Sequence, residues 1–227
     1  MLNNNISSKK FLYMIILITL FLIAYFFFNA DKKQYIMEGT VYETPVYYIN
    51  NNQRMKVMII GGIHGNEIGG IIAADDIVDN EYDWADFIII PRANIEAFKQ
   101  NVRAPYYMSD LNRAFPGKLL ATDTEELAFG LYSFIQDVNP DLVIDLHEWR
   151  RKYDGDGSTN SNGLIVSSGD MKFFKAIENV YADCIGANSD YKVMLEFGGI
   201  SGTLNREVSE GLGIPALTIE SNMNTDI

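Results

Sequence analysis

Residues 57–67 read VMIIGGIHGNE, and this stretch decides the fold class. Its first part, VMIIG at 57–61, is an uninterrupted apolar run that is typical of a strand buried on both faces. Glycines then allow a tight turn, and residues 68–78 (IGGIIAADDIV) carry the apolar spacing of a helix. A buried strand that leads directly into a helix indicates an α/β fold, in which functional side chains gather at the carboxyl ends of the strands.

The same alternation continues along the rest of the chain. Short apolar runs predict strands at 87–90, 142–146, 164–166, 193–197 and 216–219, and amphipathic stretches predict helices at 125–138 and 171–187. Continuous apolar strands that alternate with helices predict a sheet with helices on both faces.

Composition limits the classes of partner. The chain has 227 residues and a formal net charge of −12, so it lacks the basic face that nucleic acid binding requires. A hydrophobic content of 48% is enough for one globular domain with a sizeable core. The single cysteine excludes an internal disulfide and a Cys-rich zinc motif. Only two histidines occur, His64 and His147.

An apolar segment precedes this domain. Residues 11–28 read FLYMIILITLFLIAYFFF, without a charge, a glycine or a proline. As a helix the segment would span ~27 Å, close to the hydrocarbon core of a bilayer. A cleaved signal peptide is the alternative, but its best cleavage site, Phe28-Asn29-Ala30, places a bulky side chain where a small one is needed. We therefore predict a tail at 1–10, a transmembrane signal anchor at 11–28, a linker at 29–45 and the globular domain at 46–227.

The charges that flank the predicted anchor favour a domain outside the cell. Lys9, Lys10 and the amino terminus precede the segment, whereas Asp31 partly offsets Lys32 and Lys33 on the other side. Positive charge favours the cytoplasmic side of a membrane, although the bias here is slight. We expect a single-pass membrane protein with a cytoplasmic amino terminus and an extracellular domain.

Both histidines follow predicted strands. His64 comes after the first strand and Glu67 stands three residues later, so the two side chains can converge on one side of a turn. His147 directly follows the strand at 142–146. Imidazole nitrogens and a carboxylate oxygen are suitable ligands for a catalytic zinc ion, which keeps one position open. His64, Glu67 and His147 therefore predict one zinc site per chain, and Asp145 is a candidate for orienting an imidazole.

Two further segments carry candidates for catalysis and substrate binding. Glu220 ends the last predicted strand, where it is either a base or a solvated strand end. Residues 110–117 read DLNRAFPG, in which Arg113 offers a planar fork for a carboxylate and Asn112 offers hydrogen bonds. Arg103 lies earlier in the same long loop, and long loops in compact domains are often functional.

Four motifs together resemble one family of enzymes. GGIHGNE, DLNRAFPG, DLHE and PALTIE occur in that order between residues 55 and 220, and together they resemble the zinc carboxypeptidase superfamily. HGNE in particular is similar to its succinylglutamate desuccinylase/aspartoacylase branch. The resemblance implies a three-layer α/β/α domain with a mixed, mainly parallel central sheet that holds a zinc-dependent hydrolase site.

The resemblance also implies a role for each candidate residue. The zinc ligands are the same three residues that the spacing indicates. Glu220 would be the general base, and Arg103 would polarise the scissile carbonyl. Asn112 and Arg113 would bind a substrate carboxylate, and Asn94 matches a structural or substrate-binding asparagine of that branch.

The function favoured by these features is a membrane-anchored zinc-dependent hydrolase that cleaves the amide or ester bond of an N-acyl amino acid-like substrate. One alternative is a carboxypeptidase that trims peptides such as cell-wall stem peptides, because the chain ends shortly after Glu220, without the C-terminal subdomain of aspartoacylase-like enzymes. A second alternative is an inactive, zinc-stabilised binding module, but the presence of Glu220 argues against it. The expected partners are a small carboxylate-bearing substrate or peptide and, through residues 11–28, a membrane.

Overall fold

The computed structural model describes residues 34–80, 82–149, 163–185 and 193–222, together with residues 16, 18 and 19. The chain divides into two compact units, Met1–Lys33 and Gln34–Ile227. The predicted anchor at 11–28 lies outside the described residues, apart from those three positions. Among the residues that are described, no helix has the length and apolar character needed to cross a bilayer.

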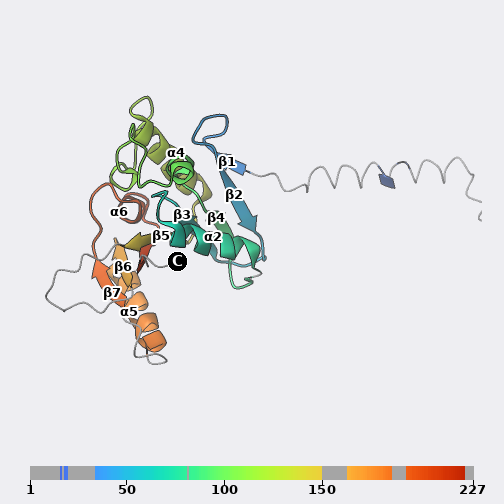
Figure 1. Cartoon of the computed structure of the whole chain (residues 1–227). Helices are drawn as coiled ribbons and strands as arrows, with labels where there is room; N and C mark the ends of the chain where they lie inside the picture. Colours follow the sequence, from blue (N-terminus) through green and yellow to red (C-terminus); the bar gives the residue numbers. More distant parts are fainter. Residues whose placement is uncertain are drawn as a thin grey trace, which may run out of the picture. The chain divides into compact units, whose positions relative to one another are not determined.

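Within the described part of the second unit, eight strands form one mixed sheet (Figure 1). Their bounds are Gln34–Ile36 (β1), Thr44–Ile49 (β2), Lys56–Gly61 (β3), Asp86–Ile90 (β4), Leu142–Trp149 (β5), Gly163–Ser168 (β6), Val193–Phe197 (β7) and Ala216–Asn222 (β8). The strand order is β1-β2-β4-β3-β5-β8-β6-β7. Four neighbouring pairs, from β4 to β8 and between β6 and β7, are parallel, and the others are antiparallel. The predicted α/β fold with a mixed sheet is confirmed.

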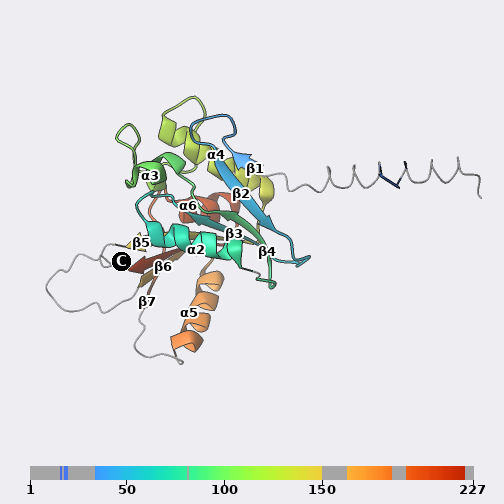
Figure 2. The same ribbon diagram turned by 45° about the vertical axis from the view of Figure 1, so that its right-hand side comes forward.

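Helices cover both faces of this sheet (Figure 2). They are α2 (Ile68–Asp79), α3 (Ile95–Gln100), α4 (Asp123–Val138), α5 (Met171–Ile185) and α6 (Leu204–Arg206), with a 3-10 turn η1 (Leu111–Arg113) and a π-helical turn η2 (Glu207–Leu212). Successive residues of β3 face opposite sides because side chains alternate along a strand. Ile60 packs in one apolar cluster with Leu131 of α4, and Ile59 packs in another with Ala74 of α2. The sheet therefore lies between two helical layers.

The domain begins earlier than the sequence predicted. The predicted linker at 29–45 has to be shortened, because Gln34–Ile36 forms β1 and pairs antiparallel with β2. Ile36 is buried in the core. A strand of three residues is too short to display a strand's alternation of apolar and polar positions, so the pattern could not reveal it.

β5 and β8 run further than their apolar stretches predicted. The two strands pair in parallel as far as Trp149 and Asn222, with His147 opposite Glu220. Both site candidates therefore lie inside strands, and the prediction that His147 follows its strand and that Glu220 ends one is wrong. Backbone pairing continues through these polar residues because their side chains face a pocket rather than the apolar core.

Candidate active site

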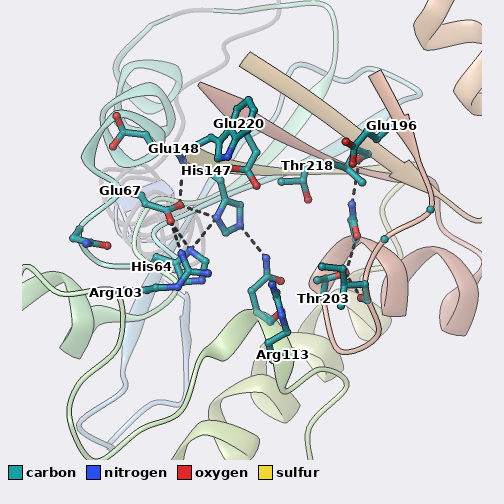
Figure 3. A pocket seen from close by; sticks show the side chains of 18 residues that line it. His64, Glu67, Arg103, Arg113, His147, Glu148, Glu196, Thr203, Thr218 and Glu220 are labelled. Carbon is teal, nitrogen blue, oxygen red and sulfur yellow. Dashed lines mark hydrogen bonds and ion pairs between the residues drawn. The ribbon is translucent and has the colours of Figure 1, made fainter. Parts of the chain in front are cut away.

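The three predicted metal ligands lie together at the carboxyl ends of β3 and β5 (Figure 3). His64 and Glu67 lie on the turn between β3 and α2, and His147 lies on β5. The Nδ1 atoms of the two imidazoles each lie 2.7 Å from a different oxygen of Glu67 and 3.1 Å from one another. All three side chains are buried. Folding thus brings residues from two distant segments into one cluster.

Two carboxylates hold the opposite nitrogens of the imidazoles. His64 Nε2 lies 2.9 Å from Asp110 Oδ1, and His147 Nε2 lies 2.9 Å from Asp145 Oδ2. Because an ionised carboxylate only accepts hydrogen bonds, each Nε2 carries the proton and donates. In a neutral imidazole held in this way Nδ1 has the lone pair, and in both histidines Nδ1 is the atom that faces Glu67.

This cluster fits a bound cation. Two imidazole lone pairs and a carboxylate converge, with one ligand atom from each residue within 4.8 Å of the others. Three acceptors at such distances repel one another unless a positive charge lies between them. Two imidazole nitrogens and one carboxylate, without sulfur, form a set of ligands that suits zinc and leaves a coordination position open.

The pKa values of Glu67 and His147 also indicate that the cluster stabilises positive charge. Burial alone would raise the pKa of Glu67, but hydrogen bonds with His147 and His64 lower it to about 2. Burial alone would lower the pKa of His147, yet its contacts with Asp145 and Glu67 raise it well above its ordinary value. The buried carboxylates therefore stabilise positive charge at the position where the Nδ1 atoms meet.

Arg103 and Glu148 hold the side chain of Glu67 in place. Arg103 donates from Nη1 to Glu67 Oε1 at 3.1 Å and from Nη2 to Asp110 Oδ2 at 2.9 Å. The backbone N–H of Glu148 donates to Glu67 Oε2 at 3.1 Å, and its own carboxylate accepts a hydrogen bond from the backbone N–H of Gly69 at 2.9 Å. Arg103 lines the pocket, so its positive charge is placed beside the cluster and within reach of a ligand.

Glu220 lies beside the His-Glu-His cluster, on the strand next to that of His147. Its register opposite His147 places both side chains on the same face of the sheet. Burial raises the pKa of Glu220; the charge of His147 opposes this shift, and the charge of Glu67 adds to it. A carboxyl group with a raised pKa is suited to accept a proton and to return it.

A pocket of about 520 Å³ opens next to the cluster, and Asn112, Arg113 and Glu220 line it. Asn112 is buried; its Oδ1 accepts a hydrogen bond from the backbone N–H of Leu204 at 2.9 Å, which ties η1 to α6. Arg113 donates from Nη1 to the Asn112 carbonyl at 2.6 Å. The predicted long loop contains α3, and its part between α3 and α4 brings the predicted substrate-binding residues to the pocket.

Asn94 lies in a different position from the other candidates. It caps the amino terminus of α3, where its Oδ1 accepts a hydrogen bond from the backbone N–H of Ala97 at 3.1 Å. The side chain is fully buried and does not line the pocket. The structure therefore gives Asn94 a structural position rather than a substrate-binding one.

Sequence reasoning missed the roles of Asp110 and Glu148. Both stand in the recognised motifs, Asp110 in DLNR and Glu148 in DLHE. The signal that could have found Asp110 is the general pairing of metal-binding histidines with carboxylates, which calls for one acidic partner per imidazole.

Gly65 allows the turn that carries His64 to pack directly on α3. A Cβ atom at Gly65 would lie 1.9 Å from the Ala97 carbonyl carbon and 2.1 Å from the Phe98 nitrogen. Both are backbone atoms, so we expect Gly65→Ala to lower the free energy of unfolding by ~3 kcal/mol or more. Gly39→Ala is the control, because nothing lies within 4 Å of its added Cβ and its positive φ should cost only ~1 kcal/mol. Urea unfolding of both variants measures the difference, and equal losses would contradict this packing argument.

The fold and the site together define a class. A mixed α/β sheet between helical layers, with a His-Glu-His cluster at the carboxyl ends of its central strands, has the architecture of the zinc carboxypeptidase-like proteins. Residues 53–220 match the family model described as the succinylglutamate desuccinylase/aspartoacylase catalytic domain. The chain belongs to this family.

Solved structures show the same relationship. A succinylglutamate desuccinylase/aspartoacylase from Rhodobacter sphaeroides is 25% identical, with a TM-score of 0.60, over 81% of this chain and 54% of its own. An aspartoacylase family protein from Mesorhizobium loti is 23% identical, with a TM-score of 0.63, over 83% of this chain and 59% of its own. The cell shape determinant protein Csd4 from Helicobacter pylori is 19% identical, with a TM-score of 0.61, over 74% of this chain and 45% of its own. The last two similarities show a shared fold.

The matching region covers about half the length of each of these solved structures. No curated protein sequence matches the chain.

Proposed function

We propose that this domain is a zinc-dependent hydrolase that cleaves the amide or ester bond of an N-acyl amino acid-like substrate. The observation that carries the proposal is the convergence of His64 Nδ1, His147 Nδ1 and the Glu67 carboxylate beside Glu220 in one pocket. The family of the chain supports it, because the family model is named for a desuccinylase and an acylase.

In this proposal each residue of the pocket has a separate role in hydrolysis. A bound zinc ion would supply a Lewis acid and lower the pKa of a water molecule. Glu220 takes a proton from the attacking water and passes it to the leaving group. Asp110 and Asp145 accept hydrogen bonds from the Nε2 atoms and so keep both Nδ1 atoms facing Glu67, where these three residues would hold the metal. Arg103 contributes positive charge where negative charge develops on the carbonyl oxygen, and Arg113 binds the substrate carboxylate.

A substrate screen with zinc-loaded protein tests this proposal. We expect release of the amino acid from N-acyl amino acids, measured by the appearance of a free amine. A carboxypeptidase would use the same groups, because Arg113 would bind the free carboxylate of a peptide equally well. Hydrolysis of short peptides alone would favour that function. Hydrolysis of neither class at full zinc occupancy would favour a binding module.

Arg113→Ala should weaken substrate binding rather than the chemical step. Removing a charge-assisted contact to the carboxylate should raise KM by about 10- to 100-fold, with kcat changed much less. The matched control is the same substrate with its carboxylate converted to an amide, for which wild type and variant should have similar KM values. A fall in kcat without a change in KM would contradict the role given to Arg113.

We also propose that residues 11–28 anchor the protein in a membrane, because the segment is apolar throughout. Lys9 and Lys10 precede the segment, which favours a cytoplasmic amino terminus and an extracellular domain. Intact-mass analysis of membrane-extracted protein should give the full-length mass. Protease treatment of whole cells should remove the domain. A soluble product that begins near Asp31 would disprove the anchor, and full protection from protease would disprove the orientation.

A further inference from the structure

Glu196 is a pocket residue that the proposed mechanism does not use. It lies on β7 and lines the pocket. Figure 3 shows it on the side away from the metal ligands, with Thr218 between Glu220 and Glu196. Among the described residues, no ion pair or hydrogen bond involves its carboxylate. Glu196 therefore adds a carboxylate to this end of the pocket.

The strand register shows which face of the sheet Glu196 occupies. Asp145 of β5 is paired with Thr218 of β8. Thr218 is paired with Val166 of β6, and Val166 is paired with Glu196 of β7. Paired residues of neighbouring strands point to the same face, so Glu196 shares the face of the metal cluster. With strands ~4.8 Å apart, its Cα atom lies ~10 Å across the sheet from that of Thr218.

One wall of the pocket connects Glu196 to Arg113. A Cβ atom at Gly202 would lie 2.4 Å from the Arg113 carbonyl oxygen, so the segment that leads into α6 packs directly on the Arg113 loop. Asn205 of α6 is buried, and its Nδ2 donates to the Val166 carbonyl at 3.2 Å. Val166 is the residue paired with Glu196. Arg113 and Glu196 thus line one pocket, on segments joined by this packing and this hydrogen bond, and Figure 3 shows the two side chains apart from one another.

The surface between these two charges suits an aliphatic chain. Val166, Ile200 and Thr218 line the pocket and offer methyl groups. A positive group at one end and a negative group at the other complement a ligand that carries a carboxylate and a cation. We propose that the substrate is an Nα-acyl amino acid with a cationic side chain of the lysine or ornithine type. Its α-carboxylate binds Arg113 and its side-chain ammonium binds Glu196. This inference rests on the proposed function, because it assumes that the pocket holds the leaving amino acid.

Binding of free amino acids tests this inference without turnover. Isothermal titration calorimetry on the zinc-loaded full-length chain compares lysine with norleucine, which has the same number of side-chain carbons and no ammonium group. We expect lysine to bind about tenfold more tightly than norleucine. This factor is at the low end of the range for a hydrogen bond to a charged group, because Glu196 is exposed. Glu196→Gln should remove the difference. Glu38→Gln, which removes an exposed charge after β1, should keep it. If lysine does not bind, or binds no more tightly than norleucine, the inference is wrong.

Turnover separates this inference from the proposed function. Nα-acetyllysine should have a kcat/KM about tenfold above that of N-acetylnorleucine, and Glu196→Lys should shift the preference to N-acetylglutamate. Equal turnover of the lysine and norleucine substrates would support the hydrolase and refute the role of Glu196. No turnover of any substrate at full zinc occupancy would refute the proposed function, and with it the acylated substrate; the calorimetry would then decide only whether Glu196 binds a side-chain ammonium group.

Discussion

Glu220→Gln is expected to lower kcat by roughly 10²–10⁴-fold while zinc content and substrate affinity stay near those of the wild type. Glutamine keeps the shape of the side chain and one hydrogen-bonding oxygen, but it cannot accept and return a proton. Burial raises the pKa of Glu220, and its register opposite His147 places it beside the cluster without a place among the three ligands. Steady-state assays measure kcat, and elemental analysis of the same sample measures zinc.

The control for this variant is Glu38→Gln, which makes the same chemical change at an exposed position outside the pocket. It should leave kcat and zinc content unchanged. If Glu220→Gln turns over substrate at a near-normal rate with full zinc occupancy, another group transfers the proton and the proposed mechanism is wrong. If the variant loses zinc instead, Glu220 contributes to metal binding rather than to proton transfer.

The parts of the site that could be predicted depend on local spacing or on a general property of sheets. His64 and Glu67 share one turn, so their proximity follows from the sequence alone. His147 could be added because parallel strands bring their carboxyl ends to the same edge of a sheet. The helix at α4 could be placed because residues 125–138 are amphipathic, and the structure shows a capping box of Thr122 and Glu125 at its start.

The parts that escaped prediction depend on tertiary packing. Asp110 reaches His64 across a sequence separation of 46 residues, through a loop whose path no pattern specifies. Glu196 reaches the pocket because β6 runs antiparallel to β8, and neither this direction nor its register can be read from apolar runs. For Asn94 the sequence left a structural and a substrate-binding role open, and only the fold shows that its side chain caps the amino terminus of α3.

His147→Ala should reduce zinc affinity by well over 100-fold. Loss of a residue that only supports a ligand typically reduces metal affinity by about 10- to 100-fold. The variant would leave two of the three ligands and would also remove the partner of Asp145, a fully buried carboxylate whose Oδ1 already lacks a hydrogen bond among the described residues. We therefore expect zinc to be lost and the metal-free protein to be less stable than the metal-free wild type.

Asp145→Asn is the matched variant, because it separates the effect of removing the His147 imidazole from the effect of changing its orientation and protonation. It keeps the imidazole, but an amide can donate a hydrogen bond to Nε2 and so favour the tautomer with its proton on Nδ1, the atom that faces Glu67. Zinc affinity should fall by about 10- to 100-fold, less than in His147→Ala. Competition with a chromophoric chelator measures both affinities, and thermal unfolding with and without chelator reports binding independently, because zinc bound only to the folded state raises Tm. Wild-type protein that binds no zinc, or a His147→Ala variant that keeps a full equivalent, would show that these three residues do not form the metal site.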